Sequence, residues 1–140
     1  MIQRIRPLLV VLTLAAAFGL APAANAAEVN ARAEAPKVIV AKVHADWCGA
    51  CEALAPTVAA IQEKYGTSDV LFVTLDFTSE ASTVQAAMLG EALGIGEAIR
   101  RHNNTGVLLV MPGNGPSSLE AFSHKSELAE IVRAIETLRS

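Results

Sequence analysis

Short continuous runs of apolar, largely β-branched residues alternate along the chain with stretches in which apolar residues recur at helical spacing. Residues 38–43 (Val-Ile-Val-Ala-Lys-Val) and 70–77 (Val-Leu-Phe-Val-Thr-Leu-Asp-Phe) are typical of strands buried on both faces. A third strand is predicted over 106–111, and the turn-forming sequence Pro-Gly-Asn-Gly-Pro at 112–116 then predicts a hairpin returning over 118–122. The pattern therefore predicts four strands, of which the last two form a hairpin.

Helical spacing fills the intervals between these strands. A helix is predicted over about 49–65 and should end at Gly66; its apolar face comprises Leu54, Val58, Ile61 and Tyr65. A second helical region opens with the polar residues 78–80 and continues to about Leu93, with Ala87, Met88, Leu89 and Leu93 as its expected apolar side. A further turn of helix is predicted over 97–101. Strand, helix and strand within about 40 residues form a βαβ unit with a right-handed crossover.

The last helix closes the predicted domain. Ser123 is a favourable N-cap for it, and the two arginines near its end suit the negative end of the helix dipole. Its apolar stripe consists of Leu128, Ile131, Val132, Ile135 and Leu138. The resulting order, β–α–β–α–β–β–α, predicts an α/β fold with a central mixed sheet flanked by helices.

The first 26 residues have the pattern of a secretory signal peptide rather than of a folded element. Arg4 and Arg6 precede an apolar run over about 8–20, and Ala24-Asn25-Ala26 provides a small-residue cleavage site. An uncleaved anchor is the alternative, but the apolar run is shorter than the roughly 20 residues of a membrane span. We therefore expect a signal peptide over 1–26, a flexible leader over 27–36, a single domain over 37–140, and a periplasmic or secreted protein.

Charge and composition narrow the function classes. The chain has a formal net charge of -3 and 4% aromatic residues. Cleavage after Ala26 would remove the two positive charges of Arg4 and Arg6 and make the remaining domain more acidic. A mildly acidic domain with few aromatics does not fit nucleic-acid binding. Nothing in the sequence indicates an organic cofactor, and we expect a monomer.

Cys48 and Cys51 carry the candidate chemistry. They lie three residues apart at the predicted junction between a strand and a helix, so Cys48 falls at the helix N-terminus and Cys51 one turn later. Unpaired N–H groups and the positive end of the helix dipole stabilise a thiolate there, and the thiolate is the attacking species in disulfide exchange. Two cysteines so close in sequence close too small a loop to stabilise a fold usefully. Their purpose is therefore expected to be chemical.

Two alternatives to a redox pair remain open at this point. The cysteines could be inert, or they could belong to a metal site. A structural zinc site normally has four ligands, but the sequence has no second Cys-x-x-Cys, and its three histidines lack zinc-knuckle spacing. A soft metal such as copper on Cys48, Cys51 and His44 is the metal-binding alternative, because thiolates suit Cu(I).

Residues 37–138 resemble the thioredoxin superfamily. The resemblance rests on Trp47-Cys48-Gly49-Ala50-Cys51 after a buried strand, on Pro56 within the following helix, and on the order of elements. It implies a thioredoxin-like fold, Cys48 as the catalytic nucleophile and Cys51 as the catalytic resolving thiol. It also implies that Trp47 lies flat beside the site where a substrate chain binds, although plain packing would equally explain this tryptophan.

Three positions depart from the family pattern. Lys42 stands where many members have a buried aspartate; its ammonium would favour thiolates, or it reaches the surface and takes no part. Thr105-Gly106 replaces the usual cis-proline before the third strand, and we expect a trans bond because a non-proline cis bond costs about 2.5–4 kcal/mol. The Gly-Ala pair between the cysteines has no ionisable group, which favours a reductant. Lys42, Thr105 and Gly106 are therefore candidate substrate-binding or tuning residues.

Together these features predict a thiol–disulfide oxidoreductase acting on protein disulfides in a bacterial-type envelope. Its expected partners are protein disulfides or dithiols and, in an oxidising compartment, a membrane electron donor. The alternatives are a soft-metal carrier without redox turnover and an adaptor whose cysteine pair is vestigial.

Overall fold

The computed structural model describes residues 35–102 and 104–140. The predicted signal peptide and all but the last two residues of the predicted leader lie outside the described residues, so both remain predictions. Within the described ranges, no helix is long and apolar enough to span a bilayer.

A four-stranded mixed sheet forms the centre of the domain. Its strands are β1 (Val38–His44), β2 (Val70–Asp76), β3 (Val107–Pro112) and β4 (Glu120–Ser123), in the spatial order β2-β1-β3-β4. The first two strands are parallel, whereas β3 is antiparallel to both β1 and β4. The α/β class and the central mixed sheet are thus confirmed.

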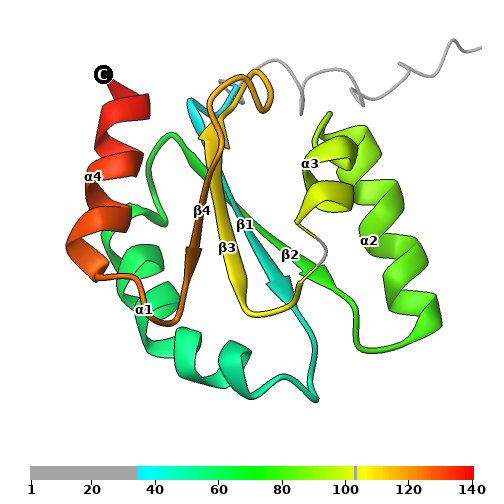
Figure 1. Cartoon of the computed structure of the whole chain (residues 1–140). Helices are drawn as coiled ribbons and strands as arrows, with labels where there is room; N and C mark the ends of the chain where they lie inside the picture. Colours follow the sequence, from blue (N-terminus) through cyan, green and yellow to red (C-terminus); the bar gives the residue numbers. More distant parts are fainter. Residues whose placement is uncertain (1–34, 103) are drawn as a thin grey trace, which may run out of the picture. The chain divides into compact units, whose positions relative to one another are not determined.

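Four helices cover the two faces of the sheet. These are α1 (Gly49–Tyr65), α2 (Glu80–Ala92), α3 (Gly96–Arg101) and α4 (Leu128–Arg139). In Figure 1, α1 and α4 lie on one side of the sheet, and α2 and α3 lie on the other. The core accordingly has one large cluster on each side of the sheet, and a third, small cluster contains Ala45, Cys48 and Cys51.

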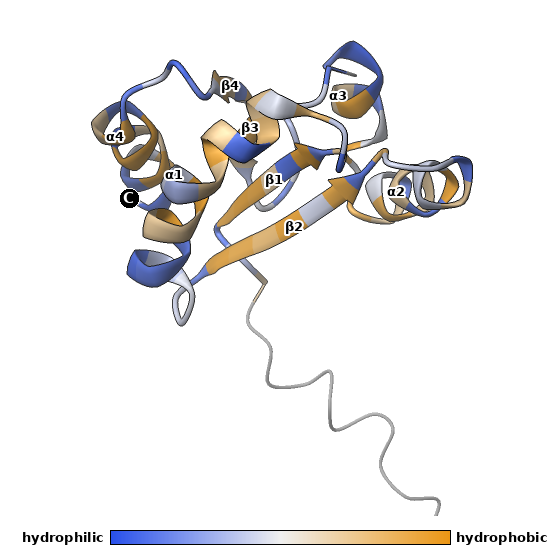
Figure 2. Cartoon of the chain, turned by 90° about the horizontal axis from the view of Figure 1, so that it is seen from below, coloured by the Kyte–Doolittle hydropathy of each residue, from blue (hydrophilic) through white to orange (hydrophobic). Residues whose placement is uncertain are grey.

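Alternation along β1 determines what each of its residues faces. Val38 and Val40 belong to the cluster under α1 and α4, whereas Ile39, Ala41 and Val43 belong to the cluster under α2 and α3. Because successive strand residues point to opposite faces, Lys42 and His44 lie on the α1 side. Figure 2 shows the hydrophobic strands sandwiched between the two helical layers.

Helix α1 has the predicted bounds. Its buried face comprises Leu54, Val58, Ile61 and Tyr65, as expected, and also includes Cys51. The helix continues through Pro56 without interruption. Gly66 caps its C-terminus with a right-handed backbone conformation (φ -63°), so its left-handed freedom is not used.

Of the four apolar residues predicted for the packed side of α2, only Leu93 packs against the core. Ala87, Met88 and Leu89 are exposed, Met88 by 69%, and the buried residues are Ala86 and Gly90. A Cβ on Gly90 would clash with Cδ1 of Ile99, so the missing side chain lets α3 approach closely. Apolar spacing pointed to the wrong side because this contact depends on small residues.

The start of the last helix also differs from the prediction. Ser123 is not its N-cap, because Ser123 still pairs with Val107 at the end of β4. The helix begins one turn later, after Glu127, which forms a capping box with Glu130. The third strand likewise begins at Val107 rather than Gly106, whose positive φ of 81° lies outside the extended region that regular strand residues adopt.

Polar contacts join the end of α4 to the end of α1 and to the residue that precedes β2. The buried Tyr65 hydroxyl donates to Oε1 of Glu136 over 2.6 Å. Nε of Arg139 donates to Oδ1 of Asp69 over 2.7 Å, and Nη1 of Arg139 donates to Oε2 of Glu136 over 3.2 Å. These contacts close the end of the domain opposite the β1–α1 junction.

Candidate active site

Cys48 is the N-cap of α1. Its backbone is extended (φ -98°, ψ 104°), and its Sγ accepts a hydrogen bond from the backbone N–H of Cys51 over 3.2 Å. The N–H of Cys48 itself donates to the carbonyl of Ala45 over 3.1 Å, which fixes the loop leading into the helix. The sulfur thus occupies the capping position normally taken by a Ser or Asp oxygen, where helix amides are free to donate.

The two thiols differ in their access to solvent. Both are free, but Cys48 keeps 8% of its surface exposed whereas Cys51 keeps only 1%. The Cys51 thiol points inward and donates to the carbonyl of Val43 over 3.7 Å. Both cysteines are thus buried, and Cys48 keeps the larger exposed fraction while Cys51 lies one helical turn further along.

The surroundings of the two thiols shift their pKa values in opposite directions. Burial raises the pKa of Cys48, but hydrogen bonds from the side chains of Cys51 and Thr105 and from the amides of Cys51 and Ala50 bring it below its usual value. Burial raises the pKa of Cys51, and its hydrogen bond to Cys48 adds to the effect. The geometry therefore favours a thiolate at Cys48 and a protonated thiol at Cys51.

Thr105 and Gly106 close the site from the side of β3. The Gly106 N–H donates to the carbonyl of Val43 over 2.9 Å, the same carbonyl that the Cys51 thiol contacts. A Cβ on Gly106 would stand 2.6 Å from Cβ of Ala50 and 3.4 Å from Sγ of Cys48. No peptide bond of the described residues is cis, so Thr105 follows a trans bond, as predicted. The loop before β3 thus lies directly against the first turn of α1.

The comparison with known families agrees with this arrangement. The family model described as Thioredoxin matches residues 20–90, just over half of the chain. The chain belongs to the thioredoxin family. Membership and fold together make it a thiol–disulfide oxidoreductase in the general sense.

Individual relatives are distant. The thioredoxin of Coprinus comatus is 26% identical over 107 residues, covering 73% of this chain and 92% of the relative. The chloroplastic thioredoxin F-type of Brassica napus is 39% identical over 49 residues, covering 35% of this chain and 26% of the relative.

Solved thioredoxin structures resemble the chain to a similar degree. Thioredoxin F from spinach chloroplast, in its short form, is 25% identical with a TM-score of 0.48, covering 75% of this chain and 79% of that chain. A mutant thioredoxin from Halobacterium salinarum is 20% identical with a TM-score of 0.49, covering 75% of this chain and 77% of that chain.

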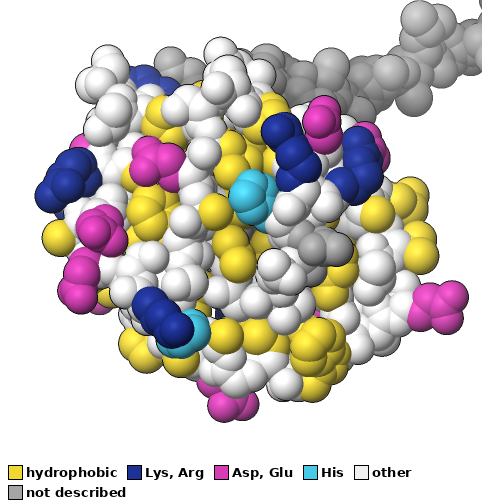
Figure 3. Space-filling view, viewed as in Figure 1, with side chains coloured by type: hydrophobic (Ala, Val, Ile, Leu, Met, Phe, Trp, Pro, Cys, Tyr) yellow, Lys and Arg dark blue, Asp and Glu magenta, His cyan; other side chains and the backbone are white. Residues whose placement is uncertain are grey.

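Trp47 projects from this thioredoxin-family site into solvent. Its side chain is 68% exposed although it directly precedes the largely buried Cys48. Packing in the core therefore does not explain this tryptophan. Figure 3 shows hydrophobic side chains gathered at the lower end of the molecule, where the β1–α1 loop lies.

Lys42 lies on the α1 side of the sheet but is not fully enclosed. It is half-buried, and its register partners are Thr74 of β2 and Leu108 of β3. This position is two residues before His44 on the same face of the strand. A partly exposed site lets the ammonium keep contact with water while its stem packs on apolar neighbours.

A polar network that sequence reasoning missed supports the loop before Cys48. Nε2 of His44 hydrogen-bonds Oδ1 of Asp46 over 3.1 Å, and the Asp46 N–H donates to Oγ1 of Thr78 over 3.0 Å. Thr78 in turn donates through both its hydroxyl and its N–H to Oδ1 of Asp76. The signal in the sequence was a polar residue after each of the two parallel strands, whose carboxyl ends meet at one edge of the sheet.

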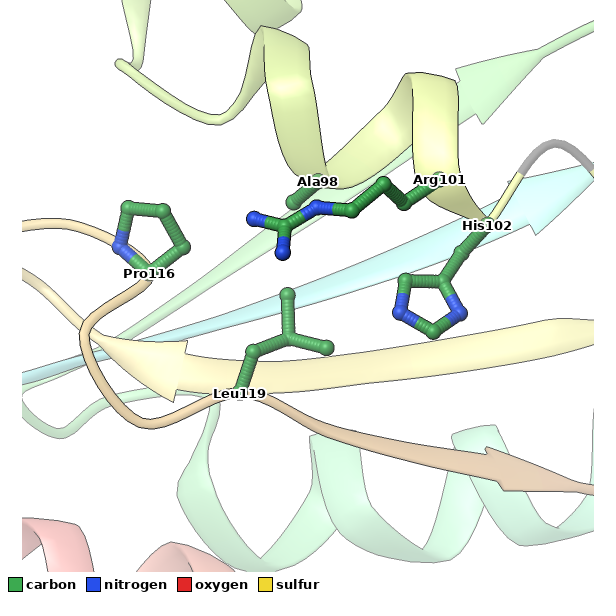
Figure 4. Close-up of a pocket in the computed structure, with 5 residues that line it drawn as sticks. All are labelled: Ala98, Arg101, His102, Pro116 and Leu119. Carbon is green, nitrogen blue, oxygen red and sulfur yellow. The ribbon is translucent and has the colours of Figure 1, made fainter.

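A cavity of about 200 Å³ lies elsewhere, lined by Ala98, Arg101, His102, Pro116 and Leu119. Figure 4 shows the Arg101 and His102 side chains projecting toward Leu119 from the end of α3. None of its lining residues belongs to the Trp47–Cys51 segment. Arg100 pairs with Glu91 and Arg101 with Glu97, so both guanidinium groups already have carboxylate partners.

The part of the chain that the structure describes offers the metal-carrier alternative no cluster of three ligands. Among residues 35–102 and 104–140, no three His, Cys, Asp or Glu side chains are grouped so that they could hold a metal ion. His44 instead uses Nε2 to contact Asp46.

Proposed function

We propose that this protein exchanges disulfides with protein substrates, with Cys48 as the attacking thiolate and Cys51 as the resolving thiol. The hydrogen bond from the Cys51 amide to Sγ of Cys48 carries this proposal, because it stabilises negative charge on the more accessible sulfur. The lowered pKa of Cys48 and the raised pKa of Cys51 support the same division of roles.

The reaction needs no reactant beyond the dithiol and the substrate disulfide. The Cys48 thiolate attacks one substrate sulfur, forming a mixed disulfide and releasing the other sulfur as a thiolate. Cys51 then loses its proton and attacks Sγ of Cys48, which forms the Cys48–Cys51 bond and releases the second substrate thiol. Two electrons pass from the protein to the substrate, and the reverse sequence oxidises a dithiol.

The exposed side chain of Trp47 supports the proposal that the substrate is a protein. A large apolar side chain exposed beside a reactive sulfur provides surface for an extended polypeptide, and exposed aromatic residues are enriched at protein interfaces. Thr105 and Gly106 lie on the β3 side of the same sulfur. A substrate chain would therefore lie between Trp47 and the loop before β3.

The proposal also includes the compartment in which the protein acts and the source of its electrons. The signal-peptide pattern of residues 1–26 supports export to a bacterial-type envelope, where the protein acts as a monomer. A reductant in an oxidising compartment needs electrons from elsewhere, which favours a membrane donor as its second partner. N-terminal sequencing of protein recovered from the envelope should show Ala27 as the first residue.

Insulin reduction and disulfide trapping test the central proposal. The reduced protein should cleave insulin disulfides, Cys48→Ser should abolish this activity, and Cys51→Ser should accumulate mixed disulfides through Cys48. Ala87→Ser is the control, since it introduces a serine at an exposed position of α2, outside the Trp47–Cys51 segment.

Two results would contradict the proposal. The first is a Cys51→Ser variant that traps no partner while Cys48 alkylates no faster than free cysteine. The second is protein that purifies with bound metal, loses it on changing either cysteine, and never cycles its disulfide.

A further inference from the structure

A small cavity lies beside the outermost strand of the sheet, outside the Trp47–Cys51 segment. Strand β2 forms one end of the strand order, and Figure 2 shows α2 beside it. The cavity between these two elements has a volume of about 160 Å³. Sites for organic ligands usually have about 300–1,000 Å³, so this cavity has room for a single side chain rather than for such a ligand. Its lining residues are Thr74, Asp76, Ser82, Gln85, Ala86 and Leu89.

Among the described residues, Asp76 is the only charged one that lines this cavity. Its Oδ1 accepts two hydrogen bonds, one from the hydroxyl and one from the N–H of Thr78, whereas Oδ2 accepts none from the described residues. The hydrogen bonds of Thr78 hold the pKa of Asp76 below its usual value, and the charge of His44 adds to the shift. The carboxylate is therefore ionised at neutral pH and keeps one oxygen for a ligand.

The uncharged residues around Asp76 suit an alkyl chain that ends in a cation. Ala86 and Leu89 supply apolar surface, while the Thr74 hydroxyl and the Gln85 amide supply oxygens that accept hydrogen bonds. Lysine and arginine combine an apolar stem with a charged head that only donates hydrogen bonds. An acidic side chain would be repelled by the carboxylate, and an apolar one would leave Oδ2 without a donor.

A short series of hydrogen bonds joins the cavity to the active-site loop. The Thr78 hydroxyl donates to Oδ1 of Asp76 and accepts from the Asp46 N–H over 3.0 Å. Asp46 directly precedes Trp47, and its own carboxylate is 78% exposed. A protein docked on Trp47 that continues past Thr78 therefore reaches the cavity and meets two carboxylates on the way, which complements a basic substrate surface.

We propose that the cavity between β2 and α2 binds a lysine or arginine side chain of the substrate protein, with the Asp76 carboxylate as its anionic partner. The inference rests on the proposed function and adds a substrate class to it, namely proteins that carry a basic residue within reach of the reacting disulfide. The stem of the bound side chain packs on Ala86 and Leu89, and its charged head donates to Oδ2 of Asp76. Binding there changes kcat/KM for the substrate but not the reactivity of the Cys48 thiolate.

A series of disulfide-bonded peptides tests this preference. The peptides share one sequence and carry Lys, Arg or Gln at a single position, which is moved outward step by step on both sides of the disulfide. For the wild-type protein, kcat/KM should be about fivefold higher with Lys or Arg than with Gln at the positions that reach the cavity, as expected of a partly exposed ion pair. Added salt should reduce this ratio, because it screens the two charges.

Three variants assign the preference to the cavity. Asp76→Asn should bring kcat/KM for the Lys and Arg peptides down to the Gln value, while alkylation of Cys48 is unchanged because asparagine keeps an oxygen for Thr78. Gln85→Lys places a cation in the cavity and should abolish the preference with Asp76 still present. Glu80→Gln is the matched control, since it removes an exposed negative charge from the first turn of α2, outside the cavity, and should keep the preference.

The inference is overturned if the wild-type ratio of Lys to Gln is close to one at every position, or if Asp76→Asn and Glu80→Gln lower it equally. The second result would show that overall negative charge, and not the cavity, attracts the substrate. If Asp76→Asn does not fold, an unchanged preference in Gln85→Lys overturns the inference instead. Failure of the proposed function looks different, because the wild-type protein would then reduce none of the peptides.

Discussion

The Thr105 side chain helps to hold the pKa of Cys48 below its usual value, which couples the loop before β3 to the first turn of α1. Burial alone would raise the pKa of this thiol, so the hydroxyl belongs to the group of donors that reverses the effect. A proline near this point would have no donor to offer. The departure from the family pattern at Thr105-Gly106 therefore supplies a thiolate-stabilising contact.

Thr105→Val should weaken the thiolate at Cys48. Removing the hydroxyl that favours the thiolate should raise the pKa of Cys48 and move the midpoint of its alkylation to higher pH. The pH dependence of iodoacetamide alkylation measures this shift. Thr105→Ser keeps the hydroxyl and should retain the wild-type midpoint; equal midpoints in the Val and Ser variants would contradict the assignment.

Trp47→Ala should impair protein substrates selectively. We expect the kcat/KM for insulin reduction to fall several-fold while iodoacetamide alkylation of Cys48 is unchanged, because a small reagent needs no surface beside the sulfur. Stability should change by less than about 0.5 kcal/mol, as is usual for exposed side chains. Met88→Ala removes a similarly exposed apolar side chain from α2 and serves as the control. An equal loss in both variants would show that Trp47 has no special role.

Gly106→Ala should disturb the site by crowding α1. Its Cβ would lie 2.6 Å from that of Ala50, and the positive φ adds strain, so we expect a loss of about 2–4 kcal/mol in unfolding free energy and slower exchange. Gly94→Ala isolates the backbone strain, because Gly94 also has a positive φ but has open space around it. Adding Ala50→Gly should recover the steric part of the loss. Without that recovery, the close approach would not be the cause.

Tyr65→Phe should make the protein less stable at neutral pH and reduce its sensitivity to acid. The Tyr65 hydrogen bond, followed by the charges of Arg139 and Lys64, holds the pKa of Glu136 below its usual value. A carboxyl with a lowered native pKa stabilises the fold above its unfolded pKa, and this contribution is lost as pH falls through the native value.

Urea unfolding of Tyr65→Phe, Glu136→Gln and the double variant over pH 2–7 checks this prediction. The difference between wild type and Tyr65→Phe should shrink toward the acid end of the range, and the double variant should be no worse than Glu136→Gln alone. A difference that is constant with pH would mean that the hydroxyl does not act through Glu136.

Local patterns along the chain were enough to locate most elements and the cysteine pair. Helix α1 has its predicted bounds because its apolar spacing, the strand before it and Gly66 after it are all local signals. The two cysteines were placed at its start for the same reason. By contrast, the predicted packing side of α2 was right only at Leu93, because the close approach at Gly90 depends on Ile99 of another helix.

The sequence by itself determined the order of strands and helices, the α/β class and the spacing that places Cys51 one turn after Cys48. Only the tertiary structure decided which groups surround these sulfurs. The Thr105 hydroxyl comes from the loop before β3, whereas Thr78 and Asp76 come from the end of β2 and the residues after it. Hydrophobic periodicity shows which face of one segment packs against the core. The pKa values and hydrogen bonds of the two thiols depend instead on atoms from segments that are far apart in the sequence.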